Sequence, residues 1–134
     1  MKNILTPPEN TELTENATSI YWFDKDGILC SLYKKVPPVS MEENQRIIDE
    51  FRELTAGQKF CLLMDITYSG TSDKAGREFA AKEFPKIVKA MAMLSGLPVS
   101  RMMANLFLKL NPPPYPAKMF ANEHDAKQWL KQYL

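Results

Sequence analysis

The sequence predicts a single α/β domain with a mixed, mostly parallel sheet. The central observation is the apolar run KFCLLMD at Lys59–Asp65, bounded by Gly57 and Gly70, which has the pattern of a strand buried on both faces. Segments with helical periodicity lie on both sides of this run, and parallel neighbours need such long connections. An early hairpin adds an antiparallel pair. The expected order of elements is β-β-α-β-α-β-α-β-α.

Size and charge exclude several classes of protein. The 134 residues suit one domain, and a net charge of +1 gives no field that favours nucleic acid. No apolar run is long enough for stable insertion in a membrane, and the start has no signal-peptide core, so a cytoplasmic location is expected. Residues 1–16 are polar and without a clean period. We therefore expect a flexible N-terminal arm at 1–16 and the domain at 17–134.

The first half of the chain predicts a hairpin and a helix. Two β-rich runs, Ala17–Asp24 and Ile28–Tyr33, flank Asp26-Gly27, a dipeptide typical of tight turns with positive φ at both central residues. Ser40 begins a capping box, S-M-E-E, and the helix after it ends near Gly57. The apolar stripe of this helix consists of Ile47, Ile48, Phe51 and Leu54.

The second half predicts three helices and two strands. A helix capped by Ser72 or Asp73 runs towards Pro85. The composition of Ile87–Ser95 favours a helix, but its place between Pro85 and Gly96 favours a strand, and we predict a strand. A short strand at 117–120 and a helix capped by Asn122 end the chain. Before them lies the cleanest helical stripe, formed by Val99, Met102, Met103, Leu106, Phe107 and Leu110.

The residues that carry chemistry do not form a catalytic or metal-binding motif. The sequence contains neither G-x-G-x-x-G nor a P-loop, and His124 is the single histidine. Cys30 and Cys61 are far apart in strand-like runs, which favours reduced core thiols over a zinc or redox pair. We therefore expect a non-enzymatic domain with no catalytic residue, metal or cofactor.

The loop that follows the central strand is the expected contact site. Sites in open α/β sheets gather beyond the carboxyl ends of the strands, and this loop leads into a helix. Ordinary loops use the same residue types, so a purely structural role is the alternative. The expected interaction residues are Asp65, Thr67, Ser69, Thr71, Ser72, Asp73, Lys74 and Gly76.

Methionine is frequent, with eight residues, and two interpretations are open. Methionine fills irregular cores, which is the first interpretation, but it also lines adaptable binding surfaces. If the methionines line a pocket for an apolar ligand, the pocket residues would be Met91, Met93, Met102, Met103 and Phe107. Ala104 and Leu108 lie off the main stripe of their helix, and with Arg101 and Asn105 they form a candidate exposed patch for a partner or a dimer.

The order of elements, the run LLMDI and a following D-x-x-G together resemble the STAS fold of the anti-anti-sigma factors. The segment SRMMANLFLKLNPPPYPAKMF and a terminal A-x-x-W-L resemble the bacterial group labelled SpoIIAA-like or STAS/SEC14-like. The resemblance covers about residues 17–134. It implies a regulatory domain or, through the SEC14-like kinship, a lipid binder.

The resemblance also bears on regulation by phosphorylation. Anti-anti-sigma factors carry D-S-S-G or D-S-T-G before the second helix, and a partner kinase phosphorylates the second hydroxyl residue. Here that motif falls on Asp73, Lys74, Ala75 and Gly76, so both hydroxyl residues are missing and the usual phosphoswitch is not expected.

Two functions follow as expectations. The first is a regulatory domain that binds a protein partner or forms a homodimer through the 65–76 loop, the start of the second helix and the third helix. Changing Asp73 or Lys74 would then weaken partner binding. The second is a binder of a small apolar ligand or lipid.

Overall fold

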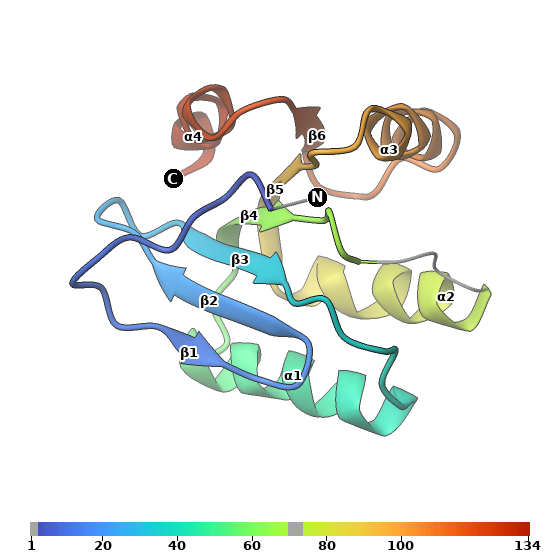
Figure 1. Cartoon of the computed structure of the whole chain (residues 1–134). Coiled ribbons are helices and arrows are strands. Elements are labelled where there is room, and N and C mark those ends of the chain that lie inside the picture. Colours follow the sequence, from blue (N-terminus) through green and yellow to red (C-terminus); the bar gives the residue numbers. More distant parts are fainter. Residues whose placement is uncertain (1–2, 70–73) are drawn as a thin grey trace.

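The computed structural model describes residues 3–69 and 74–134 (Figure 1). They form one sheet with helices packed around it. The strands are β1 (Thr14–Glu15), β2 (Ser19–Phe23), β3 (Leu29–Tyr33), β4 (Phe60–Asp65), β5 (Val88–Leu94) and β6 (Ala117–Phe120). The helices are α1 (Met41–Leu54), α2 (Lys74–Glu83), α3 (Pro98–Leu110) and α4 (Glu123–Leu130), with short 3-10 turns at Phe84–Lys86 and Lys131–Tyr133.

The sheet follows the chain, in the order β1-β2-β3-β4-β5-β6. The first three strands pair antiparallel, and β3 to β6 pair in parallel through helical crossovers. This confirms the predicted mixed, mostly parallel α/β fold, including the strand at β5. The two-residue strand β1 was not predicted, because it lies in the polar arm.

Local sequence accounts for the ends of several elements. Ser40 caps α1 by accepting a hydrogen bond from the Glu43 amide at 3.1 Å, and Asn122 caps α4 in the same way. The predicted β2–β3 hairpin is present, but positive φ at both central residues was a wrong expectation. Only Gly27 has positive φ there, at 84°, and Asp24 holds the turn by accepting from the backbone amides of Asp26 and Ile28.

The two faces of the sheet carry separate cores. On one face, α4 packs through Ala126 and Leu130 against strand residues that include Cys30, Cys61 and Leu63. On the other face, side chains of α1 and α2 cover residues that include Leu29 and Leu62. Strand β4 contributes to both cores, which confirms that the predicted run is buried on both sides over Phe60–Asp65, whereas Lys59 is exposed and lies before the strand.

The N-terminal arm is packed and not loose, which corrects our expectation for residues 3–16. Leu5 is 2% exposed and belongs to the core under α4. Strand β1 extends the sheet by pairing with β2. The arm crosses the α4 side of the sheet (Figure 1). A few isolated contacts hold the arm. Such contacts leave no regular spacing of apolar residues in its sequence.

The buried thiols make stability depend on pH. Burial raises the pKa of the Cys30 thiol from its ordinary value of 9.0 to about 12, and burial also raises that of Cys61. The unfolded thiol ionises near pH 9 while the native thiol stays neutral. Its contribution to stability is therefore complete below pH 9 and is lost as the pH rises towards 12. We expect the free energy of unfolding in urea to fall by roughly 1 kcal/mol between pH 8 and pH 10 from Cys30 alone.

The Cys30→Ala variant is the control for this pH dependence. It should lose that part of the fall, whatever its stability at pH 8. Equal falls in the variant and the parent would contradict the assignment to Cys30.

Candidate functional site

Asp65, at the carboxyl end of β4, is fully buried and bonded on both carboxylate oxygens. Oδ2 accepts from the backbone amides of Ile4 and Leu5, at 2.5 and 2.8 Å. Oδ1 accepts from the amide and the hydroxyl of Thr67, at 2.9 and 2.6 Å. These contacts place Asp65 inside the fold, where it fastens the N-terminal arm and presents no atom to a partner.

Thr67 is also buried and connects two loops. Its hydroxyl accepts a hydrogen bond from the Gly96 amide at 3.1 Å, in the segment that leads into α3. This hydrogen bond places the loop after β4 beside the loop before α3 at the carboxyl edge of the sheet. The burial and hydrogen bonds of Asp65 and Thr67 fit a purely structural role, which was the alternative to a contact site for the residues of this loop.

The other predicted interaction residues are less enclosed. Ser69 is exposed, and Lys74 is exposed at the start of α2, with its Nζ 3.9 Å from a Glu78 oxygen. Gly76 is half-buried in the first turn of α2. Thr71, Ser72 and Asp73 lie outside the described residues, as does the predicted cap of α2.

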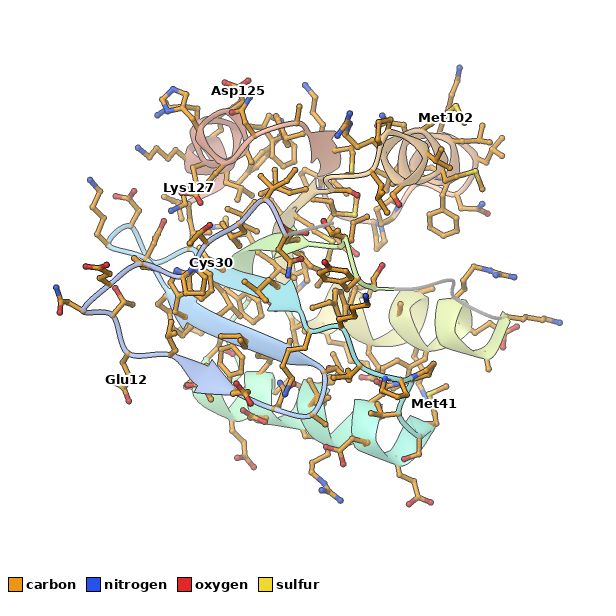
Figure 2. All side chains as sticks on the ribbon, viewed as in Figure 1. Glu12, Cys30, Met41, Met102, Asp125 and Lys127 are labelled. Carbon is orange, nitrogen blue, oxygen red and sulfur yellow. The ribbon has the colours of Figure 1, made fainter. Side chains whose placement is uncertain are left out.

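A group of exposed apolar side chains lies on α3, where the predicted stripe faces solvent. This corrects the expectation that Met102 and Met103 fill the core. Figure 2 shows Met102 on the side of α3 that points away from the rest of the fold. The six stripe residues, Val99, Met102, Met103, Leu106, Phe107 and Leu110, are between 46% and 68% exposed. We call these six side chains the outer face of α3.

The opposite side of α3 packs on the sheet, so the candidate patch at Ala104 and Leu108 was also wrong. Both residues are half-buried, and α3 lies beside β6 at the end of the sheet (Figure 1). Arg101 is turned inward, and its guanidinium donates to the Ser95 carbonyl at 2.8 Å. α4 covers one face of the sheet and α1 and α2 cover the other, and among the described residues the six side chains of the outer face of α3 belong to neither core.

The residues of the expected ligand pocket are not brought together. Met91 is buried in the core beneath α1 and α2, and Met93 packs against that core. Met102, Met103 and Phe107 lie on the outer face of α3.

A second surface feature is an open hollow between the β2–β3 turn, the arm and α4. Charges of both signs line it. Two pairs join α4 and the segment after it to the β2–β3 turn, with Lys127 Nζ 3.2 Å from Asp24 and Lys131 3.8 Å from Asp26, and Lys127 also lies 3.5 Å from Glu123 on its own helix. Across residues 3–69 and 74–134, no group of three or more His, Cys, Asp or Glu side chains is placed to hold a metal ion.

The outer face of α3 could have been suspected from the sequence. Apolar or small residues lie on both sides of the predicted helix, with the six-residue stripe on one side and Ala104 and Leu108 on the other. A helix at the end of a sheet can bury one of these sides inside the monomer. The pattern leaves open which side that is.

The strand order and helix placement define a class, the SpoIIAA-like α/β domains, as the resemblance implied. A solved protein from Shewanella loihica PV-4, described as an uncharacterized protein of the DUF3478 family with a SpoIIAA-like fold, matches with a TM-score of 0.56. It is 18% identical and covers 90% of this chain and 91% of its own, so the likeness concerns the fold. A protein of unknown function from Arthrobacter sp. FB24 is 28% identical over 83% of this chain and 97% of its own, with a TM-score of 0.30.

The chain belongs to the family described as domain of unknown function (DUF7793), which matches residues 21–134. None of the curated proteins matches it. In the part of the chain that the structure describes, every helix is too short or too polar to cross a membrane.

Proposed function

We propose that this domain is a non-catalytic regulatory domain that acts by binding protein, and that its contact surface is the outer face of α3. One observation carries the proposal: six large apolar side chains on a single helix are about half to two-thirds exposed. Scattered exposed apolar residues are normal on proteins, but a contiguous group of this kind marks an interaction site.

The free energy of covering this face supports the same function. Full burial of one such side chain contributes about 1.5–3 kcal/mol, so covering the exposed parts of six would contribute roughly 5–10 kcal/mol. Association costs offset part of this gain. Because these costs are of the same order as the gain, specific binding needs further contacts around the six side chains.

We also propose contacts for part of the predicted loop site. The Thr67–Gly96 hydrogen bond holds the loop that carries Ser69 against the start of α3. Exposed Ser69 and Lys74 are therefore proposed as peripheral contacts, together with Asp73 from the sequence motif. Ala75 occupies the position of the phosphorylated hydroxyl, so we propose regulation by contact without that phosphoswitch.

Binding of a small apolar ligand or lipid is the weaker proposal. It needs the methionines of β5 and α3 around one cavity, whereas those of α3 are on the outer face. No observation among the described residues favours it over protein binding.

Photo-crosslinking in the cells that make this protein tests the contact surface. A photoreactive amino acid at position 106 should give discrete protein-sized adducts, because Leu106 lies in the middle of the outer face. The same amino acid at position 54 is the matched control, because Leu54 is similarly exposed, at 48%, on α1. Electrophoresis and mass spectrometry measure the adducts.

Strong protein adducts at position 106 and none at position 54 would support the proposal. Equal adducts at both positions, or only lipid-sized additions at position 106, would overturn it.

A further inference from the structure

We propose that the partner of the outer face of α3 is a second copy of this chain, with two α3 helices packed antiparallel about a two-fold axis. This inference rests on the proposed function and specifies its partner. It is carried by the spacing of the outer face, by its lack of charge and by its position at the end of the sheet.

The outer face has the spacing of a helix–helix seam. Val99, Met103, Leu106 and Leu110 follow one another at intervals of four, three and four residues. This is the alternation of an apolar seam between two packed helices. Met102 and Phe107 flank the seam on its two sides.

An antiparallel arrangement makes this seam complementary to itself. With the axis near the middle of α3, Val99 faces Leu110 of the second copy and Met103 faces Leu106. Lys109 then lies beside Met102 of the other helix, where its aliphatic stem can cover apolar surface. A parallel arrangement would align the two helix dipoles, which is unfavourable.

Charge favours a second copy over an acidic partner. The segment between Glu83 and Glu123 has five basic residues and no acidic residue, which by itself would suit an acidic surface. However, Lys86 lies 3.4 Å from Glu83, the Arg101 guanidinium is bonded to the Ser95 carbonyl, and Lys118 lies over the Phe120 ring. The outer face itself is uncharged, so it fits an apolar seam better than an acidic protein or an anionic membrane.

The outer face is large enough to form the apolar centre of a dimer interface, but not the whole interface. A 13-residue helix is about 20 Å long, and its exposed apolar side chains make a patch on the order of a few hundred Å². A standard interface takes about 800 Å² from each partner. The rest of the interface would have to come from residues around α3, which lies at the β6 end of the sheet (Figure 1).

Sedimentation analysis of the full chain tests the inference. We expect a dimer with a Kd in the micromolar range or tighter, as for specific interfaces of standard size. Leu106→Glu should raise the Kd at least about 100-fold, because it buries an unpaired charge in the seam. Leu54→Glu, a matched change on α1, should leave the Kd within about twofold. Circular dichroism verifies that both variants remain folded, as expected for exposed positions.

A mixture of two variants tests the antiparallel register. Met103→Lys and Leu106→Glu should each be monomeric alone. Mixed in equal amounts, they should associate at least about tenfold more tightly than either alone. The reason is that the lysine introduced at position 103 of one copy then faces the glutamate introduced at position 106 of the other, while the other half of the seam stays apolar. In a parallel pair these two charges would not face each other.

The outcomes separate this inference from the proposed function. A wild-type chain that stays monomeric at high micromolar concentration overturns the second copy as partner. Adducts to a different protein at position 106 would then leave the proposed contact surface in place. A dimer that Leu106→Glu does not weaken, or a mixture without rescue, overturns the α3 seam or its antiparallel register, respectively.

Discussion

Replacing Asp65 with alanine is expected to destabilise the domain by about 3–5 kcal/mol. The carboxylate is fully buried and accepts four hydrogen bonds, two from the arm and two from Thr67. Its removal leaves the amides of Leu5 and Thr67 buried without this partner, at about 1–3 kcal/mol each. Urea unfolding followed by tryptophan fluorescence measures the loss, since Trp22 and Trp129 lie in or against the core under α4.

Asp26→Ala is the matched control for this substitution. Asp26 is partly exposed, and its one ion pair, to Lys131, is 3.8 Å long, so the expected cost is below about 1 kcal/mol. Hydrogen exchange gives a second readout, because the amides of Ile4 and Leu5 should lose protection in the Asp65 variant. A cost below about 1 kcal/mol for Asp65→Ala with the arm still protected would show that the arm is held by Leu5 packing alone.

The elements of this fold were readable from the sequence because each depends on local rules. Alternation and turn residues indicated the β2–β3 hairpin, and the capping residues Ser40 and Asn122 marked the helix starts. Strand β5 was the hardest to assign, because its composition favours a helix. Its position between Pro85 and Gly96, within the β-α-β rhythm, outweighed that preference.

The arm and the function of Asp65 depend on contacts that no local pattern contains. Leu5 and Asp65 are sixty residues apart, and their hydrogen bond forms only after the sheet is assembled. The position of Asp65 at the end of β4 made it a candidate contact residue. In the structure, hydrogen bonds from the amides of Ile4 and Leu5 bury this carboxylate, so Asp65 holds the N-terminal arm in place.

The orientation of α3 was missed for a related reason. Periodicity shows which residues share a face of a helix, but it does not show what covers that face. In this fold, α4 and the pair α1 and α2 already cover the two faces of the sheet. The strongest apolar stripe in the chain was therefore left outside the core.

The second large expected effect comes from comparing two leucine-to-alanine substitutions, one on α4 and one on α3. Leu130 on α4 is fully buried in the core, so Leu130→Ala should destabilise the monomer by about 2–5 kcal/mol. Leu106 on α3 is 50% exposed, so Leu106→Ala should change the stability of the monomer by less than about 0.5 kcal/mol. Urea unfolding at sub-micromolar chain concentration compares the two variants, since association would otherwise add to the stability of the parent.

Comparing these two variants tests whether Leu106 makes its stabilising contacts within the monomer or in an assembly. If Leu106→Ala is silent in the dilute monomer but costs stability as the chain concentration rises, the stabilising contacts of Leu106 lie in the assembly. If it costs as much as Leu130→Ala at every concentration, the outer face of α3 is packed within the monomer, and both the contact surface and the α3 seam fail together. Exposed apolar patches promote aggregation when nothing covers them. A role in association would account for six large apolar side chains outside the core.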